Sequence, residues 1–199
     1  MPSAQAGWDG IAHEIGLALR AAPARAGKTR VVAIDGRSGA GKTTLAKRLR
    51  AQLPGAPLVA LEDLYGGWGG LEHGISLLAG EVLRPLAAGR AAVVPRYDWV
   101  SRGWADEWVL QPPEFLVVEG VGAGARAAAR YESLLVWITA DAVVRKQRAL
   151  ERDGELFASR WNQWAAQEDR MLAREKTPAR ADFVVDGSRV VSHPRRDPG

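Results

Sequence analysis

The chain has 199 residues, 27 Lys and Arg against 23 Asp and Glu, a net charge of +4, and no cysteine, which excludes disulfides, thiolate metal sites and cysteine nucleophiles. Hydrophobic residues make up 47% and charged residues 25%, values ordinary for a folded protein of one domain. No apolar run approaches the roughly 18 residues of a membrane span, and no secretory signal is recognisable, so a cytoplasmic protein is expected.

Helical and strand patterns alternate along the chain. In chain order we expect helix Ala12–Ala21, strand Val31–Asp35, helix Thr43–Leu53, strand Pro57–Leu61, helix Glu72–Ala88, strand Ala91–Val94, an irregular aromatic stretch Tyr97–Pro113, strand Phe115–Glu119, helix Ala125–Tyr131, strand Leu134–Ile138, helices Ala142–Arg152 and Ser159–Glu175, and strand Phe183–Val185. This alternation predicts an α/β domain with a mostly parallel five-stranded sheet and helices on both faces. We expect one domain over residues 1–191, followed by a flexible tail at 192–199, which is rich in proline and charge.

The sequence GRSGAGKT at Gly36–Thr43 fits the phosphate-binding P-loop pattern, with an apolar strand before it and a helix after it. Glycines let such a loop turn its backbone N–H groups inward, and the helix N-terminus adds partial positive charge. We therefore predict the P-loop NTPase fold. The nucleotide-binding residues are expected to be Gly36, Ser38, Gly39, Ala40, Gly41, Lys42, Thr43 and Thr44. In this pattern the lysine reaches the outer phosphates and the threonine hydroxyl binds Mg²⁺.

A P-loop indicates a phosphate site but not a reaction. The chain lacks the Asn-Lys-x-Asp motif of GTPases, and it is too short for a large motor ATPase. Small kinases and regulatory ATPases remain. The mildly basic charge permits nucleic-acid binding without favouring it.

Several segments in order resemble the group of uridine kinase, phosphoribulokinase and nicotinamide riboside kinase. They are IDGRSGAGKTTLA from Ile34, LVALEDLY at Leu58–Tyr65, PRYDW at Pro95–Trp99, FLVVEG at Phe115–Gly120 and ADFVVDG at Ala181–Gly187. The likeness spans about residues 31–187. Two features depart from the family pattern: Glu62 stands where the family usually has Asp, and the segment after Tyr97 is short and lacks the usual histidine. The second departure leaves the acceptor's identity open.

The resemblance implies ATP and Mg²⁺ as cofactors and a small-molecule hydroxyl as phosphate acceptor. Lys42 is then the catalytic cation, Glu62 or Asp63 accepts the proton of the acceptor hydroxyl, and Thr43, Glu62 and Glu119 are candidate metal ligands. The family register favours Glu62 as the base. If the preceding strand persists to this point, only one of the two carboxylates faces the P-loop, because successive strand residues point to opposite faces.

Arg145, Arg148 and Arg152 fall where the family has its lid arginines, and their spacing places them on one helix face. We expect Arg145 and Arg148 to act on the transferring phosphoryl group and Arg152 to bind nucleotide, within a lid over residues 142–175; a solvated basic face is the alternative.

The candidate acceptor-side residues cluster in two aromatic segments and at one strand end. They are Tyr65, Trp68, Arg96, Tyr97, Asp98, Trp99, Arg102 and Glu119, with core packing as the alternative for about half of the aromatic ones.

These patterns together favour an ATP-dependent kinase for a small hydroxyl compound, with a nucleoside-like acceptor implied by the resemblance. The alternatives are another small alcohol, a nucleoside monophosphate, or a regulatory protein that hydrolyses ATP slowly. No membrane partner is expected, and the sequence leaves the oligomeric state open.

Overall fold

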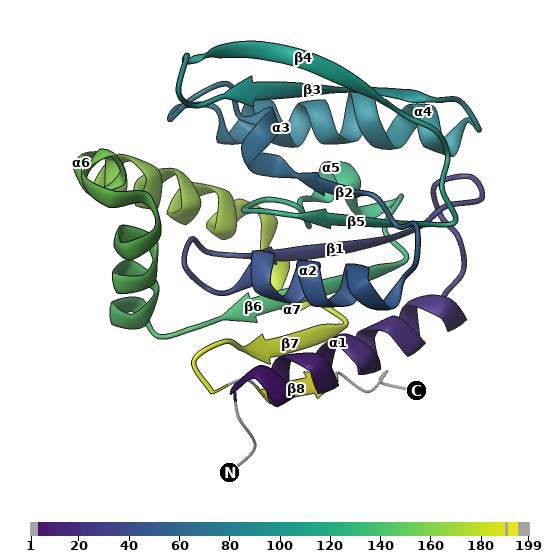
Figure 1. Ribbon diagram of the computed structural model, residues 1–199, viewed down its shortest axis with the longest axis horizontal. Coiled ribbons are helices and arrows are strands. Elements are labelled where there is room, and N and C mark those ends of the chain that lie inside the picture. Colours follow the sequence, from purple (N-terminus) through teal and green to yellow (C-terminus); the bar gives the residue numbers. More distant parts are fainter. Residues whose placement is uncertain (1–3, 190, 195–199) are drawn as a thin grey trace.

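A six-stranded sheet forms the centre of the computed structural model, which describes residues 4–189 and 191–194 (Figure 1). In spatial order its strands are β2 (Leu58–Ala60), β5 (Phe115–Glu119), β1 (Arg30–Gly36), β6 (Leu134–Thr139), β7 (Phe183–Asp186) and β8 (Val191–Pro194). The first five strands run parallel, and β8 pairs antiparallel with β7. The predicted parallel sheet is confirmed, with one antiparallel strand added at its edge.

Both faces of the sheet are buried because alternate residues of each central strand enter different hydrophobic clusters. On β1, Val31 and Ala33 pack into one cluster, whereas Val32 and Ile34 pack into the other. This alternation explains why the central strands read in the sequence as continuous apolar runs.

Helices cover each face. On the side of Val32 and Ile34 lie α1 (Ala4–Ala21) and α2 (Lys42–Gln52), which pack against each other. The other side carries α3 (Leu71–Leu77), a π-helical segment (Leu78–Leu83), α4 (Arg84–Ala87), α5 (Arg126–Ala129), α6 (Ala142–Glu175) and α7 (Thr177–Arg180). The predicted helix over 72–88 is thus one run of helical turns with a π-helical middle.

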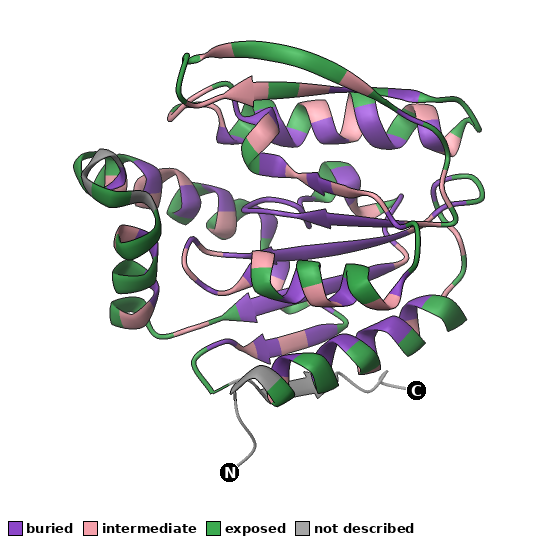
Figure 2. Ribbon diagram, in the orientation of Figure 1, coloured by how far each residue is buried: buried purple, intermediate pink, exposed green. Residues whose placement is uncertain are grey.

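A hairpin replaces the irregular stretch expected at Tyr97–Pro113. Strand β3 (Ala92–Asp98) pairs antiparallel with β4 (Gly103–Leu110), and the hairpin lies over α3 and α4 (Figure 1). Most residues of β4 are exposed on both faces, as Figure 2 shows. Such a strand lacks the alternation of apolar and polar residues by which strands are predicted, so the expectation of irregular structure was wrong.

The long helix α6 bends sharply at Gly154, whose backbone has φ 65° and ψ −155° (Figure 1). We call residues 142–153 the first arm and residues 155–175 the second arm. The two helices expected here are therefore present and joined directly at the predicted Asp153–Gly154 break.

The expected flexible tail at 192–199 is corrected in part, because residues 191–194 form β8 by backbone pairing with β7, and residues 195–199 lie outside the described part of the chain. Within the described residues, no helix is both long and apolar enough to cross a membrane.

Candidate functional site

The glycine-rich loop follows the carboxyl end of β1, with β5 and β6 paired on either side of that strand. Gly39 and Gly41 adopt φ of +77° and +110°, a region that favours glycine. The loop is closed by two bonds to one carbonyl: Ala40 N–H donates to Arg37 O at 3.1 Å, and Lys42 Nζ donates to it at 3.0 Å. Gly41 at the N-cap has no side chain to cap α2, and uncapped N-terminal N–H groups bind anions.

Lys42 is buried among carboxylates. Its side chain is 8% exposed, and burial lowers its pKa, while the negative charges of Glu119, Glu168 and Asp35 act to raise it. The Lys42 ammonium group therefore lies beside the loop at which a phosphate would bind.

Thr43 at the start of α2 and Glu119 at the end of β5 bring together two oxygen atoms that can bind a metal ion. The Thr43 hydroxyl donates to Glu119 Oε1 at 2.8 Å. Burial raises the pKa of Glu119, and the charge of Lys42 and the Thr43 hydrogen bond act against that rise. Among the described residues, no group of three or more His, Cys, Asp and Glu side chains forms a metal cage. The pair nevertheless suits Mg²⁺, which uses one or two protein oxygens together with substrate phosphates.

The two candidate bases lie on a 3₁₀ turn rather than on a strand. Strand β2 ends at Ala60, and residues 61–64 form the turn, with Leu61 and Leu64 buried three residues apart. Glu62 is exposed and Asp63 is half-buried. Burial and the charge of Glu62 raise the pKa of Asp63. The premise that the strand persists here is therefore wrong, and strand alternation does not separate the two carboxylates.

The aromatic residues on the acceptor side are buried to different degrees. Tyr65 is 4% exposed, and its hydroxyl donates to Val121 O at 2.9 Å, so its ring belongs to the core. Trp99 contacts Trp68 edge to face with ring centroids 4.9 Å apart, and its indole N–H donates to Glu62 O at 3.1 Å. Tyr97 lies against Trp99 at 5.3 Å. The structure thus gathers Trp68, Tyr97 and Trp99 beside the candidate base.

Three polar residues expected on the acceptor side lie on the hairpin. The charge of Arg96, an exposed residue of β3, acts on the Asp63 carboxyl. The Asp98 carboxylate accepts from Val100 N–H at 2.9 Å, and Arg102 is exposed at the hairpin turn with φ +57°. Asp98 and Arg102 therefore shape the turn between β3 and β4.

The three predicted lid arginines have different surroundings. Arg145 is 7% exposed, and its guanidinium donates to Ser38 O and Ala140 O, each at 3.3 Å. Arg148 donates to Gly187 O at 3.1 Å. Arg152 is exposed on the first arm, and its charge acts on both Lys42 and Glu119. Arg145 and Arg148 thus donate to backbone carbonyls. The three arginines, which were predicted to share one helix face, therefore do not share one environment.

Asp35, which the sequence suggested only as part of a strand, joins two loops at the site. Its Oδ1 accepts from Gly36 N–H at 2.7 Å and from Gly122 N–H at 2.9 Å, and its Oδ2 accepts from Gly124 N–H at 3.1 Å. The residue is fully buried, and burial raises its pKa to about 6 against the three hydrogen bonds and Lys42. A carboxylate inside an apolar strand was the signal that could have identified it.

Glu168 and Trp164 of the second arm also reach the loop. Glu168 Oε1 accepts from Ser38 N–H at 2.9 Å and from the Ser38 hydroxyl at 2.8 Å. The Trp164 indole N–H lies 2.9 Å from Ser38 Oγ and 3.0 Å from Glu168 Oε1. Of the other predicted loop residues, Ala40 is buried and Thr44 is exposed on the first turn of α2.

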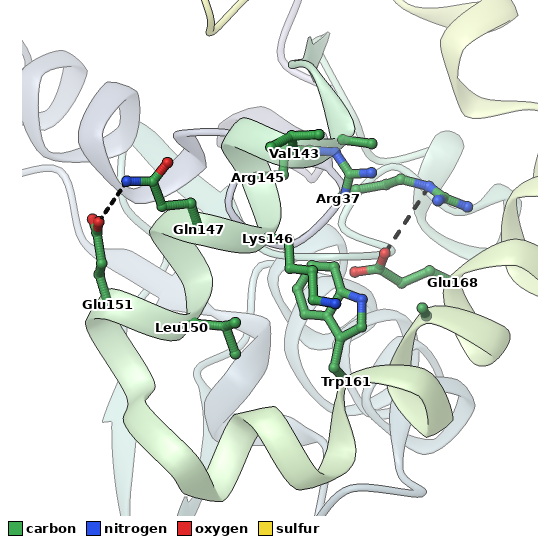
Figure 3. Close-up of a pocket in the computed structure, with 11 residues that line it drawn as sticks. Arg37, Val143, Arg145, Lys146, Gln147, Leu150, Glu151, Trp161 and Glu168 are labelled. Carbon is green, nitrogen blue, oxygen red and sulfur yellow. Dashed lines mark hydrogen bonds and ion pairs between the residues drawn. The ribbon is translucent and has the colours of Figure 1, made fainter.

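A cavity of about 660 Å³ opens between the two arms of α6, and Figure 3 shows Trp161 projecting into it. Its lining consists of Arg37, Ala142, Val143, Arg145, Lys146, Gln147, Leu150, Glu151, Trp161, Ala165 and Glu168. Lys42, Thr43 and Glu119 are not among these residues. The cavity therefore adjoins the glycine-rich loop beside Arg37, away from the predicted phosphate site.

Comparison with solved structures shows that this fold is shared with proteins described as kinases. The chain is similar to a possible uridine kinase from Bacillus stearothermophilus, with a TM-score of 0.62 and 23% identity over 89% of this chain and 96% of that one. It is also similar to D-glycerate 3-kinase from Cryptococcus neoformans, with a TM-score of 0.56 and 13% identity over 94% of this chain and 97% of that one. No protein-family model matches the sequence, and the curated proteins gave no match.

Proposed function

We propose that this chain is a phosphotransferase that moves the γ-phosphoryl group of ATP to a hydroxyl of a small molecule, with a nucleoside-like acceptor. The observation that carries the proposal is the arrangement of the glycine-rich loop. Lys42 and the Thr43–Glu119 pair lie at its α2 end, and the charge of Glu62 acts on Glu119. Positioning and charge compensation are what phosphoryl transfer requires of a protein.

The reaction assigns one role to each part of the site. The acceptor oxygen bonds to the γ-phosphorus, the bond from that phosphorus to the β–γ bridging oxygen breaks, and ADP leaves. The proton of the acceptor hydroxyl passes to Glu62 or Asp63. Lys42 and the loop N–H groups other than those of Ser38 and Ala40, which donate within the protein, compensate the charge on the phosphate oxygens. Thr43 and Glu119 would hold Mg²⁺, which neutralises charge on the β- and γ-phosphates when it is bound.

The first arm of α6 is the proposed lid. Its Arg152 is the arginine we assign to the nucleotide, since it is exposed and its charge acts on Lys42 and Glu119. Arg145 and Arg148 fix this arm to Ser38 and Gly187, which places Arg152 relative to the loop.

The acceptor is proposed to lie between the 3₁₀ turn and the hairpin. Tyr97 and Trp99, which are both partly exposed, lie there, whereas Trp68 stacks on Phe157 and packs against the core. Arg96 offers a cation. Aromatic faces suit a planar ring, which supports a nucleoside-like acceptor over an aliphatic alcohol.

The test is a measurement of ADP formation from ATP·Mg²⁺ against a panel of nucleosides, nucleoside monophosphates, sugars and vitamin alcohols. We expect turnover that depends on an added nucleoside-like hydroxyl compound and yields a phosphorylated product. Turnover with an aliphatic alcohol alone would overturn the acceptor class. Slow hydrolysis of ATP that no added compound accelerates would overturn the kinase and favour a regulatory ATPase.

The two candidate bases are separated by Glu62→Gln and Asp63→Asn, measured with saturating ATP. We expect Glu62→Gln to lower kcat on the order of 10²–10⁴-fold, the usual contribution of general-base catalysis, with nucleotide affinity little changed. Asp63→Asn is expected to weaken the dependence on Mg²⁺. An inactive Asp63→Asn beside an active Glu62→Gln would assign the base to Asp63.

A further inference from the structure

Every polar group of Ser38, in the glycine-rich loop, is bonded to α6. Its N–H and hydroxyl donate to Glu168, its hydroxyl also accepts from Trp164, and its carbonyl accepts from Arg145. Glu168 is 2% exposed, Trp164 5% and Ser38 9%, so these bonds are shielded from water. Hydrogen bonds in such surroundings are strong, and leaving one of the groups without its partner is costly.

Glu168 makes the most direct of these contacts. One carboxylate oxygen, Oε1, accepts from the Ser38 backbone N–H, the Ser38 hydroxyl and the Trp164 indole within 3.0 Å. The other oxygen faces Arg37 Nε at 4.0 Å (Figure 3). Arg37 also pairs with Asp169, the next residue of α6. The carboxylate is therefore bonded to the backbone of the loop itself and not only to a side chain on it.

The bonded residue lies where the loop needs support. Ser38 stands between Gly36 and Gly39, and glycine has more backbone freedom to lose on ordering than any other residue. A phosphate loop binds through backbone N–H groups, so its affinity depends on those groups being aligned before the ligand arrives. A fixed Ser38 restricts the glycine-rich residues on both sides of it.

We propose that Glu168, held by Trp164, is a positioning residue that pre-organises the glycine-rich loop for nucleotide from the second arm of α6. This inference rests on the proposed function, because it assumes that the loop binds nucleotide phosphates. Glu168 lies outside the glycine-rich motif, so the motif by itself does not indicate this role. Nucleotide affinity depends on a carboxylate 130 positions away in the chain from the serine it holds.

The test measures the Kd of a non-hydrolysable ATP analogue, the β,γ-imido triphosphate with Mg²⁺, by calorimetry on the full chain. Glu168→Ala removes the carboxylate, and Glu168→Gln keeps its size and one acceptor oxygen. Glu72→Ala is the matched control, because Glu72 binds Arg174 of the same arm at 2.8 Å but is exposed and has no bond to the loop.

We expect Glu168→Ala to raise the Kd roughly tenfold, about the equivalent of the backbone freedom of one residue. Glu168→Gln is expected to restore affinity to within a few-fold of wild type, and Glu72→Ala to leave it unchanged. In turnover, Glu168→Ala should raise KM for ATP much more than it lowers kcat. Should Glu168→Ala not fold, Glu168→Asp takes its place, and the shortened side chain is expected to weaken binding in the same direction.

The role of Glu168 and the proposed kinase function can fail separately in this experiment. A wild-type chain that does not bind the analogue would overturn the proposed function, and the inference with it. A wild-type chain that binds, together with a folded Glu168→Ala of equal affinity and lower Tm, would overturn the inference alone, because Glu168 would then only stabilise the fold. Equal weakening by Glu72→Ala would also overturn it, since any loosening of α6 would then suffice.

Discussion

Replacing Asp35 with Asn is the sharpest test of how the site is held together. The carboxylate accepts three backbone N–H groups from two loops, two on Oδ1 and one on Oδ2. Asn keeps one carbonyl oxygen as an acceptor. Its NH₂ group replaces the other oxygen, so at least one backbone N–H then faces a donor instead of an acceptor. A buried donor without a partner costs about 1–3 kcal/mol. At pH 7 this cost is offset, because the neutral amide does not carry the penalty of burying the carboxylate charge.

The stability of wild type relative to Asp35→Asn should rise as the pH falls. The pKa of Asp35 is raised from 3.8 to about 6 in the folded chain, chiefly by burial. Because the folded pKa lies above the unfolded one, protonation of Asp35 stabilises the fold. That contribution is fully present below pH 3.8 and is lost as the pH rises through about 6. Between pH 7 and 4.5 it amounts to about 2 kcal/mol, at 1.36 kcal/mol per pKa unit. Asn does not titrate, so the variant lacks this gain.

Urea denaturation followed by tryptophan fluorescence at several pH values between 4.5 and 7.5 measures both effects. The free energy of unfolding of wild type, relative to that of Asp35→Asn, should rise by about 2 kcal/mol between pH 7 and pH 4.5. Asp106→Asn, which removes an exposed carboxylate on β4, is the control and should follow the wild-type curve. A difference that stays constant over this range would refute the reasoning about Asp35.

Three further predictions concern the loop and the lid. Lys42→Ala should remain folded by circular dichroism but lose at least about a hundredfold in phosphoryl transfer, and near-normal turnover would contradict its catalytic role. Gly39→Ala should lower both stability and nucleotide affinity, because its Cβ would lie 2.1 Å from Arg145 O. Gly55 has the same φ of +77° but lies in open space, so Gly55→Ala measures the backbone cost alone, about 1–2 kcal/mol. An equal loss of stability in both variants would show that the contact with α6 adds nothing. Amide exchange over residues 142–175 should slow when nucleotide and acceptor bind together, and unchanged exchange would argue against a lid.

Local patterns were sufficient for the elements that are buried on both sides. The apolar runs ending at Asp35 and Glu119 predicted β1 and β5, and the glycine-rich motif predicted the loop between β1 and α2. Each of these signals lies within a few consecutive residues, because a buried parallel strand and a phosphate loop are specified by their own side chains and backbone.

Elements with weaker local signals were missed or were given a wrong boundary. Most residues of strand β4 are exposed, so the strand shows no regular apolar period, and only pairing with β3 makes it a strand. Strand β2 has three residues, too few to show where it gives way to the 3₁₀ turn that carries Glu62 and Asp63. The orientation of these two carboxylates depended on that boundary.

The sequence alone thus determined the fold class and the identity of the glycine-rich loop, because both depend on neighbours in the chain. Only the tertiary structure decided what surrounds the loop. Asp35 meets Gly122 and Gly124 because β1 pairs with β5. Glu168 meets Ser38 because α6 bends at Gly154 and its second arm returns to the loop. Such contacts join residues about 90 to 130 positions apart, and their hydrogen bonds form only after hydrophobic burial has brought the strands and helices together.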